Sequence, residues 1–364
     1  MADRSLDRLT PGCRISLSGS TLTGAKAAAL TRVTVDLDVD LFGLCVLQFN
    51  DPELAMINGA DFESGTPVKV ELGFGSQRTK VFEGEVVALE PQFRRDLSPA
   101  LKVICQESLH RLALSAMTRA FNNVDDKQIV GRIAQEHGLS SDAPSGTTGH
   151  VLQANVTDAS FLRRLAQKHG NHLRMEGKKL VIGPPPRGAA LSAGPGSGIA
   201  RIKVRIKANS QVGEVSVHGW DAAQKREILG KAKPQGQTGE GARQHGAGTL
   251  SFAGHELPAD PATAESMAKG RLRKIAEGFT TAEVEMLGEP LIAPGAEVTF
   301  TKLGAQVDGT WRVNHAEHNF SKHGYWVKFR AVRIAKPRPP RSRSLRRSPP
   351  PRRRHSPFKG SASR

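Results

Sequence analysis

Residues 33–41, VTVDLDVDL, alternate an apolar residue with a polar one at every step. Successive side chains of a β-strand point to opposite faces of a sheet, so this period of two predicts a half-buried strand. Residues 44–49 continue the apolar pattern after a short interruption, and the sequence Asn50-Asp51-Pro52 is typical of a turn. The stretch therefore predicts two adjacent strands of a β-rich region.

Further short strands are expected on either side of this stretch. Residues 68–72 and 79–83 flank the sequence GFGSQ at 73–77, which predicts a hairpin with a loop of about five residues. Residues 85–90 and 100–106 add two more strands. The first third of the chain is thus expected to form a β-barrel or a sandwich-like domain.

The next segment has the periodicity of helices rather than strands. One helix, capped by Asp125 or Asp126, is expected to end at Gly138. A second helix is expected to begin near Asp158 and to end at Gly170. A small hairpin follows them, so this segment predicts a compact α/β insert.

The chain then returns to β-structure. Residues 202–206 and 214–218 predict strands, and Asp260-Pro261 is a favourable start for one helix packed on the second barrel. The last predicted strands cover 310–314 and 325–332, with a histidine-rich loop between them. The fold class is therefore mainly β with an α+β insert: a first β-barrel, a small helix-pair and hairpin domain, and a second β-barrel with one helix packed on it.

Composition shifts set the expected domain boundaries. The predicted divisions are a first β-barrel at 1–118, an α/β insert at 119–188, a Gly/Ser/Pro/Ala linker at 189–200, a second β-barrel with one helix at 201–335, and a disordered tail at 336–364.

Charge is distributed unevenly along the 364 residues. The chain has 52 Lys and Arg against 35 Asp and Glu, a formal charge of +17. Eleven of those cations lie in 336–364, which holds no acid, so residues 1–335 carry only +6. A Pro/Arg/Ser-rich tail of this kind could bind anions, with its arginines as the candidate contacts: Arg346, Arg347, Arg352, Arg353 and Arg354.

The spacing of Asp36, Asp38 and Asp40 imitates the opening of a calcium loop. Such a loop requires Gly at its sixth position and Glu at its twelfth. Leu41 and Leu47 occupy those positions here. We therefore expect the three aspartates to form the solvated face of a strand.

Other motifs that carry chemistry are incomplete. His315, His318 and His323 could suggest a metal site, but residues three apart on a strand point to opposite faces. No phosphate-binding glycine fingerprint, nucleophile elbow or paired-cysteine spacing occurs in the sequence. We expect no catalytic residue, no metal site and no cofactor, and hence a protein that is not an enzyme.

Neither the N-terminal sequence nor any apolar run suggests a membrane or secreted protein. No signal peptide is recognisable, and no run reaches the roughly 20 apolar residues that a spanning helix requires. The three cysteines are far apart, which favours buried thiols in a reducing compartment.

Several ordered stretches resemble the late control gene D family of contractile phage tails. They include VSVHGWD at 215–221, KREILGKA at 225–232, GTWRV at 309–313, HAEH at 315–318 and the FLRRLA helix at 161–166. The family-pattern positions are Gly219, Asp221, Gly230, Gly288, Pro290, Gly295, Gly309, His318, Gly324 and Tyr325.

This resemblance implies a structural baseplate hub protein. Members of the family form homotrimers in which each chain contributes two related β-barrel tube domains. The six barrels make a pseudo-sixfold ring between the tail tube protein and a trimeric spike. The hub portions of type VI secretion spike proteins and of contractile injection systems are similar. Because nothing after Arg333 resembles a spike domain, the resemblance implies a separate spike protein. Other baseplate proteins would be further partners, and the particle baseplate, assembled in the bacterial cytoplasm, would be its location.

Two alternative functions remain at this point. One is binding of nucleic acid or an anionic surface through the basic tail, and the other is a tail-associated peptidoglycan hydrolase. Salt-sensitive binding that disappears on deletion of 336–364 would indicate the first. Clearing of a peptidoglycan zymogram would indicate the second.

Overall fold

A computed structural model describes residues 10–95, 97–207, 211–222, 224–235, 248–253, 258 and 260–335. The predicted tail at 336–364, with its five candidate arginines, lies outside the described residues. The prediction of a mainly β protein is confirmed, and a large antiparallel sheet dominates the molecule.

The first β-rich region contains seven strands and two short helices. In chain order they are β1 Pro11–Leu17, β2 Ser20–Thr21, α2 Gly24–Ala28, β3 Leu30–Asp38, β4 Leu44–Asn50, β5 Pro67–Phe74, β6 Gln77–Arg94, β7 Leu97–Gln106 and the 3₁₀ helix η1 Ser108–Ala113. The expected alternation is realised in β3 and β4, whose inward side chains are buried: Val33, Val35, Leu37, Cys45, Leu47 and Phe49.

Two details of this region differ from the sequence-based prediction. Strand β3 ends at Asp38 rather than Leu41, because the Asp38 carboxylate accepts a hydrogen bond from the Asp40 backbone N–H at 2.9 Å and turns the chain. The β5–β6 hairpin has only Gly75 and Ser76 between its strands. It closes this tightly because Gly73 lets the two backbones approach.

The insert combines two helices with short strands. Its elements are β8 Ala116–Val124, α3 Asp126–Glu136, β9 Ser140–Asp142, β10 Gly149–Thr157, α4 Asp158–Lys168, β11 His172–Glu176 and β12 Lys179–Gly183. Asp125 caps α3 in a reciprocal capping box with Gln128, and Thr157 caps α4. Both predicted helix ends are confirmed, with Gly138 and Gly170 in the left-handed conformation that suits a terminating glycine.

The rest of the described chain supplies the second β-rich region. Its elements are β13 Ala190–Ala193, β14 Ile199–Ile206, β15 Glu214–Asp221, β16 Arg226–Ala232, β17 Thr249–Phe252, α6 Pro261–Glu277, β18 Thr280–Leu287, β19 Glu297–Phe300, β20 Gly309–Ser321 and β21 Gly324–Ala335. Asp260 caps α6, whose first residue is Pro261, as expected.

Strand β20 is longer than the sequence predicted. It continues through the segment expected to be a histidine-rich loop and ends at Ser321. A bulge between Val313 and His315 shifts the register, after which Ala316 and His318 both point into the core. The period of two resumes beyond the bulge, with a histidine in an apolar position.

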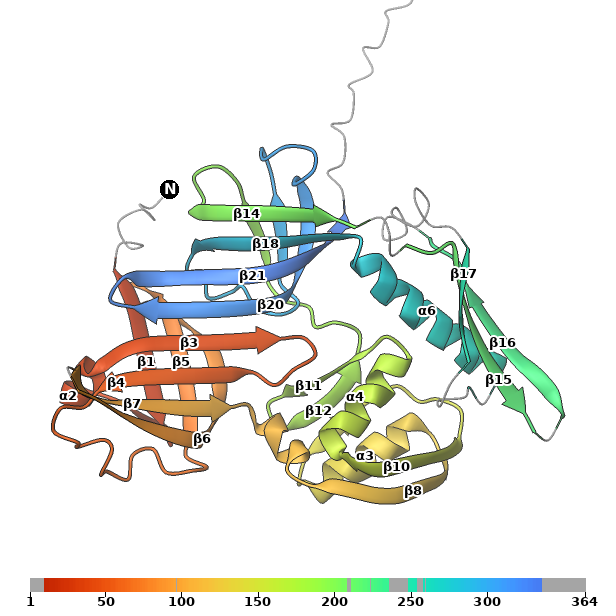
Figure 1. The fold of residues 1–364 in the computed structure, drawn as a ribbon, viewed down its shortest axis with the longest axis horizontal. Coiled ribbons are helices and arrows are strands. Elements are labelled where there is room, and N and C mark those ends of the chain that lie inside the picture. The colour runs from red at the N-terminus through yellow and green to blue at the C-terminus, as the bar shows by residue number, and fades with distance from the viewer. Residues whose placement is uncertain are drawn as a thin grey trace, which may run out of the picture.

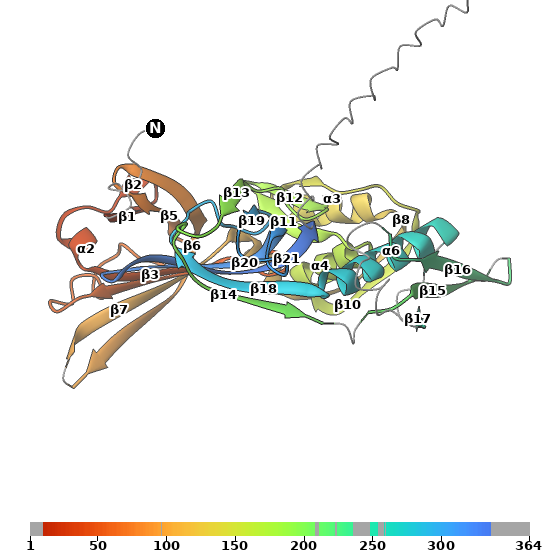
Figure 2. The same ribbon diagram turned by 90° about the horizontal axis from the view of Figure 1, so that it is seen from above.

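One sheet joins the two β-rich regions. Its main path is β14-β18-β21-β20-β3-β4-β7-β6-β5-β1-β2, and Figure 1 shows the strands from β14 to β7 side by side. The connection is the antiparallel pair of β3 and β20, with residues 32–38 opposite 315–321. Viewed from above (Figure 2), the β6–β7 hairpin extends away from the body of the molecule.

Candidate functional site

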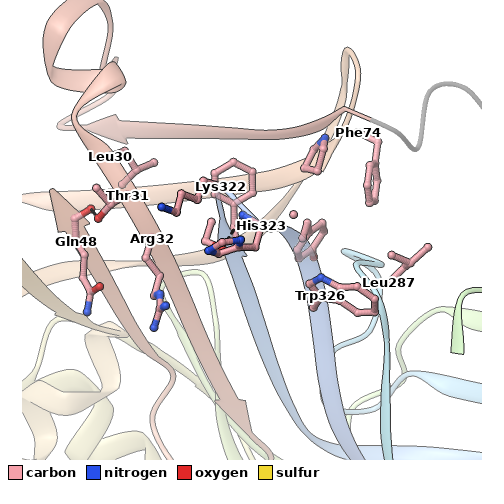
Figure 3. A pocket seen from close by; sticks show the side chains of 14 residues that line it. Leu30, Thr31, Arg32, Gln48, Phe74, Leu287, Lys322, His323 and Trp326 are labelled. Atoms are coloured by element: carbon pink, nitrogen blue, oxygen red, sulfur yellow. Dashed lines mark hydrogen bonds between the residues drawn. The ribbon is translucent and has the colours of Figure 1, made fainter. Parts of the chain in front are cut away.

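A groove of about 910 Å³ lies at the turn between β20 and β21, where the two β-rich regions meet (Figure 3). The start of β3 and the end of β5 form one side, through residues 30–32 and Phe74. Residues 320–326 and Leu287 form the other side. The groove therefore exists only because distant parts of the chain share one sheet.

The groove lining is aromatic and cationic. Phe74, Tyr325 and Trp326 contribute rings, and Arg32 and Lys322 contribute positive charge. None of the fourteen lining residues, all of them in the described part of the chain, is acidic. Such a surface can accept an apolar segment that carries a carboxylate, since the rings bury apolar area and the cations pair with the acid.

A buried histidine–tyrosine pair lies beneath the groove. The His318 Nδ1 atom lies 2.7 Å from the Tyr325 hydroxyl, and its Nε2 atom lies 2.9 Å from the Ile292 carbonyl oxygen. His318 is fully buried, and burial lowers its pKa to about 4. Burial also raises the pKa of Tyr325. The neutral imidazole donates from Nε2 to the carbonyl and accepts at Nδ1 from the hydroxyl.

Glycines fix the chain around this pair. A β-carbon on Gly288 would lie 2.1 Å from the Tyr325 ring, and the Gly288 N–H donates to the Tyr325 carbonyl at 2.8 Å. Gly324 adopts a φ of 112°, which permits the two-residue turn between β20 and β21. These constraints explain why glycine occupies both positions.

The structure brings together only some of the residues singled out in the sequence. His318, Tyr325, Gly288 and Gly324 meet at the groove, with Pro290 in the segment that leads to Ile292. The other five family-pattern positions serve packing and turns elsewhere: Gly295 in the loop before β19, Gly309 at the start of β20, and Gly219, Asp221 and Gly230 in β15 and β16. Gly230 has no room for a side chain because α6 packs directly on it.

The candidate metal histidines are separated. His315 pairs with Asp36 across the β3–β20 seam, with 2.8 Å between Nε2 and Oδ1. His323 lies in the exposed turn, and its backbone N–H donates to the Ser321 hydroxyl at 3.2 Å. Within the described residues, no group of three or more His, Cys, Asp or Glu side chains could hold a metal ion.

The sequence interpretation missed the role of the three aspartates on and just after β3. Asp36 contacts His315, Asp38 lies 3.6 Å from the Arg330 guanidinium, and Asp40 lies 2.8 Å from His172 of the insert. The predicted solvated face is thus a row of ion pairs joining three parts of the chain. The strand period shows that these residues share a face, but their partners are more than 130 positions away.

Solved structures of tail proteins have the same fold. A 43 kDa tail protein of prophage MuSo2 from Shewanella oneidensis matches with a TM-score of 0.66 and 16% identity, over 89% of this chain and 98% of that chain. A tail protein from Neisseria meningitidis matches with a TM-score of 0.63 and 15% identity, over 89% and 97%. The E. coli c3393 protein, a type VI secretion component, matches with a TM-score of 0.60 and 11% identity, over 89% and 79%.

These likenesses establish a tail-protein fold. At such low identity they show the fold alone. No curated protein sequence matches the chain. In the described part of the chain, no helix is both long and apolar enough to cross a membrane.

The family model that matches corrects two predictions. It is described as the Alg8 N-terminal domain and covers residues 10–322, so the assignment to the late control gene D family is wrong. Several of the glycines behind that assignment, such as Gly230 and Gly288, are required by close packing in this fold. The prediction that the chain is not an enzyme is also contradicted, because the family name indicates a glycosyltransferase type. The chain belongs to the Alg8 N-terminal domain family.

Proposed function

We propose that the protein is a baseplate hub component of a contractile phage tail or a related injection particle. The observation that carries this proposal is the single sheet through which β3 and β20 join the two β-rich regions. The likeness to the prophage tail protein over 98% of its length supports a role in a phage tail or a tail-like particle. A continuous sheet gives the rigid, extended surface that a scaffold between larger assemblies requires.

In this proposal three copies close into a pseudo-sixfold ring. Each copy supplies two β-rich domains, at 1–118 and 201–335, and the ring joins the tail tube protein to a separate spike protein. Other baseplate proteins would surround it. Closed rotational symmetry would cover sheet edges that otherwise pair with other chains.

The projecting β6–β7 hairpin provides a candidate contact between copies. Leu89, Phe93 and Leu97 lie on it with 40%, 65% and 59% of their surface exposed. Exposed apolar side chains grouped on one projection are typical of an interaction surface. We propose that they pack against the neighbouring copy.

The experiment is co-expression of this chain with the tube and spike proteins of the same particle, followed by mass measurement of the purified complex. Three copies per complex are expected. The variant Phe93→Asp should yield monomers, whereas Leu41→Asp, which changes a residue 61% exposed outside the hairpin, should leave the trimer intact. A stable wild-type monomer that is absent from purified particles would refute the proposal.

Glycosyl transfer is the second candidate, and the family match alone favours it. Purified protein would be incubated with a nucleotide sugar in the presence and absence of candidate acceptors. Release of the nucleotide, proportional to protein concentration, would establish this activity. A rate no higher than that of heat-denatured protein would exclude it for the acceptors tried.

A further inference from the structure

A second cavity, of about 500 Å³, lies where the insert meets the second β-rich region. The C-terminal end of α4, one face of α6 and the part of β20 around Asn314 surround it. Helix α6 approaches α4 closely at Gly170 and Gly270, where neither position has room for a larger side chain. The Arg273 guanidinium donates to the carbonyl oxygens of His169 and Gly170 and so holds the two helices together.

The cavity wall is strongly basic. Its six cationic side chains outnumber its two acidic ones, and the cations are Arg164, Lys168, Arg271, Arg273, Lys274 and Arg312. Both acids already have partners in the wall. Asp40 pairs with His172 at 2.8 Å, and Glu277 pairs with Arg312.

Three of the cations have no acidic partner. Among the residues that the structure describes, no carboxylate lies within ion-pairing distance of Arg164, Lys168 or Lys274. The charge of Lys274, one of these three cations, affects the neighbouring Asp40. The hydrogen bond from His172, followed by the charges of His172, Lys274 and Arg163, lowers the pKa of Asp40.

The cavity also presents an unused acceptor. The side-chain oxygen of Asn314 is buried and has no hydrogen-bond partner in the described structure. A buried polar atom without a partner destabilises the structure, so a ligand that donates a hydrogen bond there would gain affinity. Inorganic phosphate can satisfy the cations and has only the P–OH groups of the anion itself as donors. A sugar phosphate has separate hydroxyls, one of which can donate to the Asn314 oxygen while the phosphate stays among the cations.

We infer that this cavity binds a small organic phosphate that carries hydroxyl groups, such as a sugar phosphate. The phosphate lies among Arg164, Lys168 and Lys274, and a ligand hydroxyl donates to the Asn314 oxygen. A volume of about 500 Å³ is within the range of small-molecule sites. The site is independent of the proposed assembly role, because it lies between elements of one chain.

The inference is tested by titration calorimetry of the full chain at fixed ionic strength with three probes: inorganic phosphate, ribose 5-phosphate and ribose. Ribose 5-phosphate should bind more tightly than inorganic phosphate, and ribose alone should not bind measurably. Absence of saturable binding by ribose 5-phosphate would overturn the inference. Equal affinity for the two phosphates would overturn the hydroxyl contact.

Variants locate the binding. Arg164→Gln with Lys274→Gln should weaken the binding of ribose 5-phosphate about a hundredfold or more, since each substitution removes a charged hydrogen bond and each such bond contributes about tenfold or more to affinity. The control, Lys127→Gln with Lys328→Gln, removes the same charge from exposed positions outside the cavity. Asn314→Leu should remove only the preference for ribose 5-phosphate over inorganic phosphate. An equal loss in the control pair would show that binding is unspecific, and thermal melts would verify that each variant is folded.

Discussion

Two polar side chains are buried in different regions of this molecule, and they are accommodated in opposite ways. His318, beneath the groove, is neutral and is held by one hydroxyl and one carbonyl. Asp158, in the insert, is 5% exposed and accepts from three side chains: Arg119 at 2.5 Å, Gln153 at 2.9 Å and His137 at 3.0 Å.

The difference follows from what surrounds each group. A base in an apolar core avoids the cost of a buried charge by losing its proton. A buried carboxylate beside a guanidinium is paired and hydrogen-bonded instead. The contribution of His318 to stability should therefore change with pH. The contribution of Asp158 should instead depend on the side chains that donate to it.

The largest expected effect is on the ionic site. Asp158→Ala would remove the acceptor shared by Arg119, Gln153 and His137, and would leave Glu136 as the acidic partner of Arg119. The loss of three hydrogen bonds at a buried site should lower the free energy of unfolding by about 3–5 kcal/mol. Asp158→Asn keeps a hydrogen-bond acceptor and should lower the free energy of unfolding by a smaller amount. Urea unfolding, followed by circular dichroism, measures both variants. A loss below about 1 kcal/mol for Asp158→Ala would show that water replaces the aspartate.

The next largest effect is the pH dependence of the stability that the neutral His318 contributes. Because the pKa of His318 falls from its ordinary 6.5 to about 4 on folding, the unfolded chain binds more protons between those pH values. The contribution of His318 to the free energy of unfolding is therefore at its maximum above pH 6.5. It decreases by up to about 3 kcal/mol as the pH falls toward 4.

This dependence is measured as the difference in unfolding free energy between the wild type and His318→Gln. The difference should shrink as pH falls from 6.5 to 4 and should change little below that. Comparing the two proteins removes the contribution of the other titrating groups. A difference that stays constant across this range would show that His318 is not buried as a neutral base.

A smaller effect is expected from the hydroxyl of Tyr325. Tyr325→Phe leaves the Nδ1 atom of His318 without a donor and should lower the free energy of unfolding by about 1–3 kcal/mol. The same change made in a His318→Leu background should cost less, because the imidazole is then absent. Equal costs in the two backgrounds would mean that the hydrogen bond contributes nothing.

The smallest effect extends the comparison to a partly exposed pair. Asp36 has 43% of its side chain exposed where it meets His315. Asp36→Asn should therefore change the unfolding free energy by no more than about 1 kcal/mol, since exposed ion pairs contribute little. A loss as large as that of Asp158→Ala would show that the β3–β20 seam depends on this pair.

Local features were predictable from the sequence because neighbouring residues decide them. The alternation of β3, the caps of α3 and α6 and the glycine ends of both insert helices follow from side-chain spacing and backbone preference. The extension of β20 was not predictable in this way. Its bulge disrupts the alternation, and His318 resembles a loop residue until its partners Tyr325 and Ile292 are known.

The sequence by itself determined the class of the protein: mainly β, with a helical insert and a strongly basic last segment. The tertiary structure alone decided the joining of β3 to β20, the aromatic groove, and the basic cavity between α4 and α6. The physical reason is the distance along the chain over which each kind of interaction acts. Strand and helix periodicity depends on residues a few positions apart, whereas strand partners and cavity walls depend on packing between segments that are more than one hundred residues apart.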